Sequence, residues 1–502
     1  MGVYVLHGRE SGLEPLLRLL KLPHGEKLPE SGGVEAIIRW GTRAREPDHV
    51  WTLNRLKPVL RTANRQEREQ TLRLHGLKTG PPSGQPFSHR LDSSRQSYEP
   101  HRHPQSNPTN SSPSGFPLYI YEYWIPVFHL EALTVYEKKA VEPLRVRTVA
   151  SSRPAYRELE GGAWSYHVRR AVKDSLRAVY VLGLDYALVK AAVTADSRTV
   201  IVDVVPNPRL SEPLARLFAE AIHKFAAKVE QEAESKSEVL LGADPEFVLR
   251  NREGQMVPAS RFMDREGPVG CDAVVLSGQR TIKPLVELRP EPSADPRLLV
   301  LQLRRCMRMA AGIITDPELV WTSGGMPVRG IPLGGHIHLS GVWLHSRFIR
   351  LLDNYLSLPM LLTEDDNSRR RRPRYGYLGD VRRKSHGGFE YRSLPSWLHS
   401  PRLAAGVLCL ARCIADHYRD LKLEPLERAD VQKAFYEGDK RYLQSIVREI
   451  WKDLERLPGY SVYGKELNAL KQIVFGGNIP ATGDFRLAWK LPVAPQKVLN
   501  QV

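Results

Sequence analysis

Three short segments in the second half of the chain alternate a charged or imidazole side chain with an apolar one. They are residues 242–247 (GADPEF), 334–340 (GGHIHLS) and 389–396 (FEYRSLPS). Side chains two residues apart in a β-strand point to the same face of the sheet. We therefore predict three strands, each presenting a pair of polar side chains on one face. The pairs are Asp244 with Glu246, His336 with His338, and Glu390 with Arg392.

The first half of the chain alternates strand-like and helix-like segments. Runs rich in β-branched and aromatic residues predict strands, and apolar residues at helical spacing predict helices. The predicted strands are residues 34–41, 118–124 and 199–205, and the predicted helices are residues 64–74, 167–182 and 213–233. Residues 81–117 are rich in Pro, Ser, Gly and Asn and lack apolar periodicity, which predicts a disordered loop.

A chain of 502 residues is too long for one ordinary core, so two or three domains are expected. The charged and polar segment 231–237 is the predicted linker. We therefore divide the chain into a first domain at residues 1–230, a second at 239–417, and a mainly helical extension at 418–502 that packs on the second domain.

The composition, 42% hydrophobic and 26% charged residues, is that of a globular protein. No apolar run reaches the roughly 18–20 residues needed to cross a membrane, and the first residues lack the charged start and long apolar run that are typical of a signal peptide. Four cysteines without a CxxC pair favour a reduced, cytoplasmic protein. The net charge of +17 favours anionic partners such as nucleotides, acidic peptides or nucleic acid.

The acidic pair suggests a site for a divalent cation. Two carboxylates on one strand face repel each other unless a cation lies between them, and Mg²⁺ prefers oxygen ligands. The alternative for Asp244 and Glu246 is an exposed strand face with two solvated acids. Glu287 lies in a further alternating segment, 286–290 (VELRP), where a simple ion pair with Arg289 is the alternative. Ser293 is predicted to cap the N-terminus of a helix at 296–313.

The second half also offers imidazole and guanidinium groups. Neutral His336 and His338 could bind a metal, as HxH pairs do in zinc hydrolases. Glu390 and Arg392 could hold a metal and an anionic oxygen side by side. The run of four arginines at 369–372 is interpreted as a solvated segment, whereas Arg382 is the better candidate for a phosphate contact.

The order of Asp-Pro-Glu-Phe, Glu-Leu-Arg-Pro, Gly-Gly-His-Ile-His-Leu-Ser and Phe-Glu-Tyr-Arg-Ser-Leu-Pro-Ser-Trp resembles the phage-type carboxylate–amine ligases, type 2. These amidoligases belong to the wider glutamine synthetase and glutamate–cysteine ligase superfamily. The resemblance covers about residues 239–417. It implies an α+β fold, in which a curved antiparallel sheet of the glutamine synthetase type carries outer helices. One departure is Asp244, where the commonest family pattern has Glu.

The resemblance also implies roles for individual residues. Two or more Mg²⁺ or Mn²⁺ ions would be held by Asp244, Glu246, Glu287, His336 and Glu390. The expected catalytic residues are Arg382, Arg392 and His338, and the expected ATP-binding residues are Arg374, Arg382, Arg392 and Ser340.

The first half resembles an ATP-grasp domain of the glutamate-ligase kind. Residues 182–190 (LGLDYALVK) and 201–208 (IVDVVPNP) carry this likeness. Lys190 stands where that family has an acid, and Val205 where it has a metal-binding Asn. An ammonium group would repel the Mg²⁺ ion expected there. We therefore predict a degenerate ATP-grasp-like domain without activity.

The resemblance implies ATP-dependent amide formation through an acyl phosphate, with a carboxylate-bearing small molecule or peptide and an amine as substrates. Two other functions fit parts of the sequence. A basic protein associated with nucleic acid would explain the charge, although no recognised nucleic-acid-binding motif is present. A zinc hydrolase would use His336 and His338 without ATP.

Overall fold

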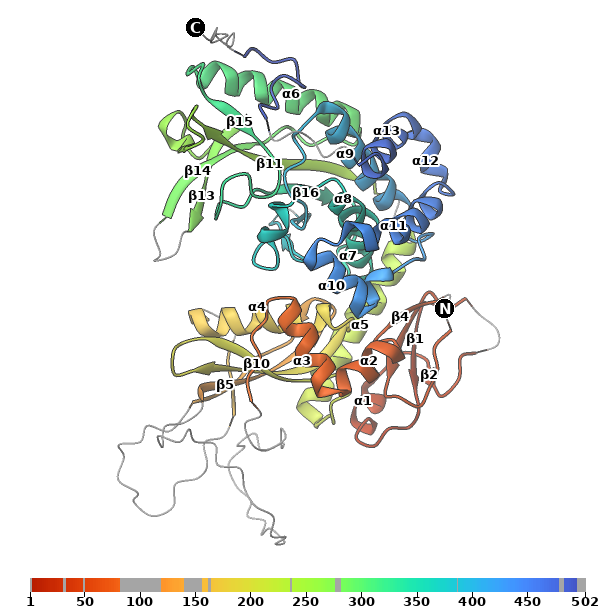
Figure 1. Cartoon of the computed structure of the whole chain (residues 1–502). Coiled ribbons are helices and arrows are strands. Elements are labelled where there is room, and N and C mark those ends of the chain that lie inside the picture. Colours follow the sequence, from red (N-terminus) through yellow and green to blue (C-terminus); the bar gives the residue numbers. More distant parts are fainter. Residues whose placement is uncertain are drawn as a thin grey trace, which may run out of the picture. The chain divides into compact units, whose positions relative to one another are not determined.

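The computed structural model describes residues 2–29, 33–47, 50–81, 119–139, 156–160, 164–234, 237–275, 281–385, 387–477 and 483–493. The chain forms two compact units, Met1–Ser235 and Lys236–Val502. Both units combine helices with sheets, which confirms the predicted α+β class (Figure 1). The loop predicted as disordered at 81–117 lies, from residue 82 on, outside the described residues.

The first unit begins with a small parallel sheet in the order β2-β1-β3-β4. Its strands are β1 (Val3–His7), β2 (His24–Gly25), β3 (Ala36–Trp40) and β4 (Trp51–Leu53). Its helices are α1 (Glu14–Leu19), α2 (Leu56–Ala63) and α3 (Arg65–Leu74). The predicted helix at 64–74 is confirmed: Asn64 is its N-cap, and its side chain accepts hydrogen bonds from the N–H groups of Gln66 and Glu67.

The second sheet of the first unit is antiparallel, in the order β10-β9-β5-β7-β8, with β6 paired to β5. Its strands are β5 (Tyr119–Phe128), β6 (Glu131–Ala132), β7 (Tyr136–Lys139), β8 (Arg157–Glu158), β9 (Tyr186–Thr194) and β10 (Thr199–Val205). The accompanying helices are α4 (Tyr166–Val181) and α5 (Glu212–Glu234). Buried Lys190 of β9 pairs with Glu122 of β5 at 2.8 Å, so this ammonium forms a buried ion pair with a carboxylate.

The second unit is built on an antiparallel sheet in the order β13-β14-β11-β16-β18-β17, and β12 and β15 also pair with β11. The strands are β11 (Leu240–Arg250), β12 (Met256–Val257), β13 (Val269–Val275), β14 (Thr281–Leu288), β15 (Val320–Thr322), β16 (Gly335–Ser340), β17 (Val381–Arg383) and β18 (Phe389–Tyr391). The three strands predicted from the polar alternation correspond to β11, β16 and β18, but β18 ends at Tyr391, so Arg392 lies just beyond its strand.

Most of the helices of the second unit follow β14. They are α6 (Pro296–Ile313), α7 (Ser346–Leu352), α8 (Leu358–Leu361), α9 (Pro401–His417), α10 (Ala429–Glu437), α11 (Lys440–Leu454), α12 (Pro458–Val462) and α13 (Gly464–Phe475). Short turns of other helix types are η1 (Ala259–Arg261), η2 (Asp353–Ser357), η3 (Ser368–Arg371) and η4 (Pro425–Glu427). No helix among the described residues combines the length and apolar character that a membrane span requires.

The predicted cap of α6 is wrong. Asp295, not Ser293, is the N-cap, and its carboxylate accepts a hydrogen bond from the N–H of Arg297 at 2.8 Å. The Ser293 hydroxyl instead accepts from the N–H of Asp295 at 3.1 Å. Ser293 is also engaged through its backbone, which exchanges two hydrogen bonds with Leu241 of β11. The sheet therefore fixes Ser293 before the helix begins.

The C-terminal helices belong to the same compact unit as the sheet. Helix α13 packs on α9, where Leu470 lies against Gly406. Arg297 of α6 forms two hydrogen bonds of 3.0 Å each with the carboxylate of Glu466 on α13. The extension predicted at 418–502 thus contributes packing and an ion pair to this unit through its described residues.

Candidate active site

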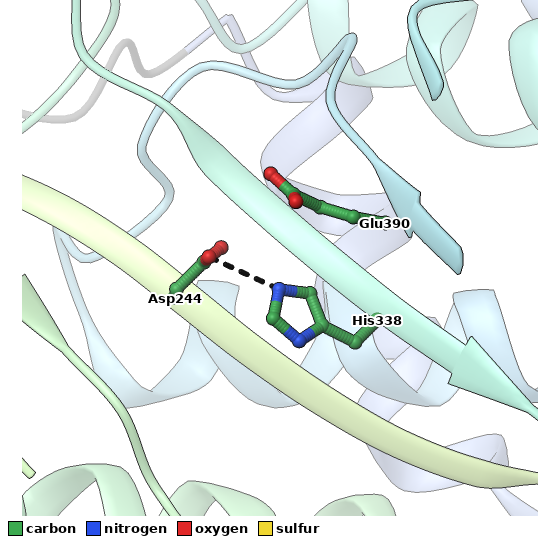
Figure 2. A group of neighbouring side chains, drawn as sticks. All are labelled: Asp244, His338 and Glu390. Atoms are coloured by element: carbon green, nitrogen blue, oxygen red, sulfur yellow. Dashed lines mark ion pairs between the residues drawn. The ribbon is translucent and has the colours of Figure 1, made fainter. Parts of the chain in front are cut away.

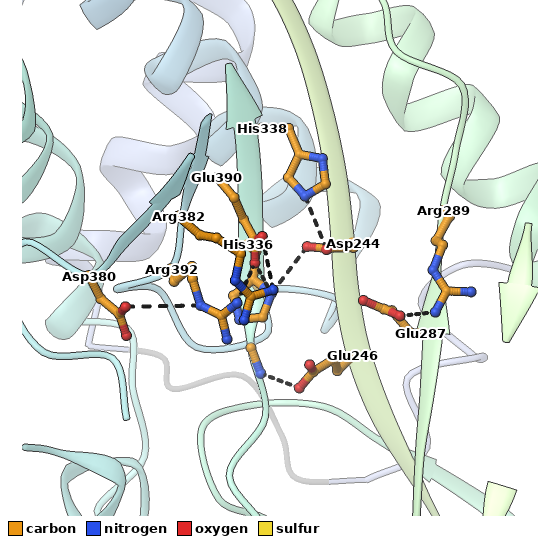
Figure 3. Close-up of polar contacts among 12 residues, drawn as sticks. Asp244, Glu246, Glu287, Arg289, His336, His338, Asp380, Arg382, Glu390 and Arg392 are labelled. Carbon is orange, nitrogen blue, oxygen red and sulfur yellow. Dashed lines mark hydrogen bonds and ion pairs between the residues drawn. The ribbon is translucent and has the colours of Figure 1, made fainter. Parts of the chain in front are cut away.

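The register of the second unit's sheet brings the predicted polar residues to one face. Residues that lie directly opposite each other on neighbouring strands share a face, and Figure 3 shows these side chains gathered beside β11 and β16. The facing pairs are Asp244 with His336, Glu246 with Glu287, His338 with Glu390, and Glu390 with Arg382. The polar pairs of three separate strands therefore form one continuous group.

Asp244, His338 and Glu390 make up a first cluster, and their ligand atoms all lie within 4.8 Å of one another (Figure 2). Nε2 of His338 lies 3.0 Å from Oδ2 of Asp244. Nδ1 of His336 lies 3.1 Å from Oδ1 of Asp244 and 3.2 Å from Oε1 of Glu390. His336 therefore bridges the two carboxylates.

The cationic neighbours keep this first cluster ionised despite its burial. Burial raises the pKa of Asp244, but the two histidines outweigh it and hold that pKa below its ordinary value. Burial and the charge of Asp244 likewise raise the pKa of Glu390, whereas His336, Lys384 and Arg392 lower it to below the ordinary value. Burial lowers the pKa of His336, but the hydrogen bond and the negative charge of Asp244 raise it. The net result is a pKa above the ordinary value of histidine.

A second cluster consists of Glu246, Asp272 and Glu287, whose carboxylate atoms again lie within 4.8 Å of one another. Glu246 accepts a hydrogen bond of 2.7 Å from the N–H of Gly334, and Glu287 pairs with Arg289. Burial raises the pKa of Glu287 to about 8, and the nearby Asp244 adds to this effect. Burial also raises the pKa of Glu246. Three carboxylates this close together are a donor set suited to a hard divalent cation.

Asp272 was not predicted from the sequence. It lies on β13, in the apolar segment 269–275 (VGCDAVV), where a single acid gives no alternating pattern. The only available signal was an isolated carboxylate in a strand-like run. Its proximity to Glu246 and Glu287 comes from the pairing of β13 with β14 and of β14 with β11.

Only some of the predicted phosphate-binding residues lie near the two clusters. Arg392 contacts Glu390 at 2.8 Å and Asp380 at 4.0 Å. Arg382 is 60% exposed and reaches Glu390 at 3.4 Å. Arg374 is exposed and lies over the ring of Tyr375, and Ser340 lies at the end of β16 opposite Leu240. The structure therefore brings Arg382 and Arg392 to the clusters, but leaves Arg374 and Ser340 outside them.

A cavity of about 260 Å³ adjoins the second cluster. Its polar lining comprises Glu246, Asp272, His336, Arg371, Tyr375, Asp380 and Arg392. Two of the four arginines predicted as solvated are in fact buried: Arg371 is 3% exposed and Arg372 is 7% exposed. Arg372 forms two contacts of 2.8 Å with the carboxylate of Glu364, so an ion pair offsets the desolvation of this guanidinium.

Comparison with known families identifies the second unit. Residues 241–491 match the family described as phage phiEco32-like COOH.NH2 ligase-type 2. No curated protein matches the chain.

Several solved structures share low identity with the chain. The macrocyclase MdnC of Microcystis aeruginosa MRC, bound with precursor peptide MdnA, is 12% identical with a TM-score of 0.28, and the match covers 45% of this chain and 100% of that one. A D-alanine–D-alanine ligase from Bacillus anthracis is 12% identical with a TM-score of 0.28, over 46% and 99% of the two chains. A bifunctional glutathione synthetase from Pasteurella multocida is 11% identical with a TM-score of 0.32, over 50% of each chain. These TM-scores are too low to assign a fold or an activity to either unit, so the ATP-grasp-like character of the first unit stays a prediction.

Proposed function

Because the chain belongs to the phage phiEco32-like COOH.NH2 ligase-type 2 family, we propose that it joins a carboxylate to an amine with ATP and Mg²⁺, through an acyl phosphate. The family membership confirms the predicted enzyme class, an ATP-dependent ligase that forms a carbon–nitrogen bond. The observation that carries the finer proposal is the pair of adjacent ligand clusters on one buried face, with Arg392 beside them. Kinship with glutamine synthetase remains part of the proposal.

The reaction would proceed in two displacements. In the first, a carboxylate oxygen of the substrate forms a bond to the terminal phosphorus of ATP, and the bond to ADP breaks. In the second, the amine nitrogen forms a bond to the acyl carbon, phosphate leaves, and the amine gives up a proton. Such reactions depend on positioning and charge neutralisation rather than on a covalent enzyme intermediate.

The residues of the site have distinct proposed roles. The first cluster, together with His336, and the second cluster would each hold a divalent cation, which would supply charge neutralisation for the phosphates. Arg392 would neutralise developing negative charge, and Glu390 would fix the direction of its guanidinium through their 2.8 Å contact. Lys384 also contacts Glu390 at 2.8 Å and would keep that carboxylate ionised.

The first unit would act as a scaffold or present the substrate. The buried pair of Lys190 and Glu122 supports this assignment, because the ammonium group already compensates the carboxylate without a metal ion. Three further points are proposed from the sequence alone. The substrates are peptides or small molecules, they bind to the first unit, and the protein is cytoplasmic.

The central test is ADP release by the purified protein with Mg²⁺-ATP and pools of amino acids or short acidic peptides. We expect one pool to stimulate release, and Glu246→Gln to reduce it by about 10²-fold or more. Glu253→Gln is the matched control, because Glu253 is exposed in the turn after β11. Mg²⁺ should also raise the melting temperature of the wild type more than that of Glu246→Gln, because a ligand of the folded state stabilises it.

The outcomes separate the proposed function from its alternatives. Wild-type turnover in Glu246→Gln would remove the second cluster from the mechanism. Hydrolysis that requires Zn²⁺ and no ATP would favour the hydrolase. Salt-sensitive binding to nucleic acid without any binding of ATP would favour the nucleic-acid-associated protein.

A further inference from the structure

Four arginines among the described residues are almost fully buried, and one of them differs from the other three. Arg39 pairs with Glu46 at 3.2 Å, Arg372 with Glu364 at 2.8 Å, and Arg486 with Asp484 at 2.5 Å. Arg371 has no ion pair with any carboxylate in the described part of the chain. A buried charge without a counter-ion is costly, which is why buried arginines are normally paired.

Arg371 is nevertheless held in a defined position. Its Nη1 donates to the carbonyl of Ser393 at 2.9 Å, and its Nη2 donates to the carbonyl of Arg392 at 3.3 Å. Its Nε is buried and has no hydrogen-bond partner among the described residues. Burial lowers the pKa of Arg371 to about 10, so the guanidinium still carries its charge at neutral pH. These contacts orient the group but do not neutralise it.

The surroundings of Arg371 provide room for an anion. It lines the cavity of about 260 Å³ together with Arg392, and Glu246 and Asp272 of the second cluster line the same cavity. Gly376, which has a φ of +59°, packs directly against the guanidinium of Arg371. A side chain at position 376 would not fit, because its Cβ would overlap Nη1 of Arg371. The cavity thus combines a guanidinium that has no direct ion pair among the described residues with carboxylates suited to a cation. Glu364, Asp380 and Glu246 favour its charge only from a longer range.

We propose that Arg371 binds a phosphoryl oxyanion in this cavity. The inference rests on the proposed function and deepens it, since the anion is either the terminal phosphoryl group of ATP or the phosphate that leaves at the end of the reaction. An arginine is suited to this role because its planar guanidinium donates two hydrogen bonds at once to a phosphate. Arg382 and Arg392 already share the carboxylate of Glu390, whereas Arg371 lacks such a partner.

The test measures binding of inorganic phosphate, ADP and the non-hydrolysable analogue AMPPNP to the full chain by calorimetry, with MgCl₂ present. Arg371→Gln should weaken phosphate binding by about tenfold or more, the effect of losing a hydrogen bond to a charged group. It should also reduce the affinity for AMPPNP to that for ADP, while the affinity for ADP stays unchanged. Arg370→Gln is the matched control, because Arg370 belongs to the same short helix η3 and is exposed.

A second variant protects the test against misfolding. Gly376→Ala keeps every charge but displaces the guanidinium of Arg371, and it should weaken phosphate binding in the same way. Melting curves and circular dichroism show whether each variant is folded. If Arg371→Gln does not fold, the measurement on Gly376→Ala decides.

The outcomes distinguish this inference from the proposed function. Equal phosphate affinity in the wild type and in folded Arg371→Gln would overturn the inference, as would the absence of phosphate binding by the wild type. A further outcome is that Arg371→Gln loses affinity for phosphate yet still binds AMPPNP more tightly than ADP by the same factor as the wild type does. That result would assign Arg371 to the released phosphate. Phosphate binding that depends on Arg371 in a protein that binds neither nucleotide would support the anion site and refute the ATP-dependent ligase.

Discussion

Glu390 illustrates how individual side chains control this site. It is fully buried, and burial alone would favour its neutral form. Arg392 and Lys384 each approach its carboxylate to 2.8 Å, and His336 approaches it to 3.2 Å. Their combined charge outweighs desolvation, so this acid stays ionised. In the second cluster the balance is reversed, since burial raises the pKa of Glu287 to about 8.

His399 provides a prediction at the same scale. Burial lowers the pKa of this histidine to about 4, although Asp365 partly opposes the shift. In the unfolded chain the pKa is about 6.5, so the unfolded state binds more protons between these values. The free energy of unfolding should therefore fall as the pH decreases from about 6.5 to 4, by up to about 3 kcal/mol from this residue.

Urea unfolding at several pH values measures this effect. The stability of His399→Gln should depend less steeply on pH than that of the wild type in this window, and both should show similar slopes above pH 7. Parallel curves throughout would mean that His399 is protonated equally in the folded and unfolded states.

At the scale of elements, β11 organises the second unit. It pairs with β14 and β16 along its length and with the short strands β12 and β15. It tolerates Pro245 in a central position, where proline is uncommon because it has no N–H to donate. The partner residue Gly335 accepts a hydrogen bond of 2.9 Å from the indole N–H of Trp397. The indole N–H of Trp397 thus supplies the hydrogen bond that Pro245 cannot donate to the carbonyl oxygen of Gly335.

The cap of α6 gives a prediction for an element. Asp295→Ala should lower the free energy of unfolding by about 1 kcal/mol, because the N–H of Arg297 loses its acceptor. Asp295→Asn should retain most of the stability, since asparagine is also a good N-cap. Chemical unfolding of the two variants and the wild type checks this. If Ser293→Ala cost stability and Asp295→Ala cost none, Ser293 would be the cap after all.

At the scale of the whole molecule, the second unit depends on the C-terminal part of the chain. Helix α9 buries most of its side chains, and α13 covers part of it through Leu470. The contact of Arg297 with Glu466 connects α6 to the same helix. The sheet that carries the clusters therefore shares its core with helices far along the sequence.

A chain that ends after His417 should accordingly lose cooperative folding. The truncation removes α13 and exposes apolar surface of α9, and burial of each such side chain contributes about 1.5–3 kcal/mol. Soluble yield and thermal melting by circular dichroism, compared with the full chain, measure the effect. An unchanged melting temperature would show that the last helices are dispensable for this unit.

The sequence by itself determined what depends on neighbours in the chain. The period of two in residues 242–247, 334–340 and 389–396 fixes which side chains share a strand face, so the strands were predictable, as were the polar pairs of β11 and β16. The four motifs in order also identified the family, because they are short and contiguous.

Tertiary structure alone decided how these strands combine. The pairing of Asp244 with His336 and of Glu246 with Glu287 depends on register between strands far apart in sequence, which no local pattern encodes. Asp272 joins the second cluster for the same reason. Arg371 and Arg372 were wrongly predicted to be solvated, because a run of arginines usually is. They are buried because Arg372 packs against Glu364 and Arg371 lines the cavity. Local alternation therefore fixes the face that each strand presents, whereas long-range packing decides which charges meet there and which lose their water.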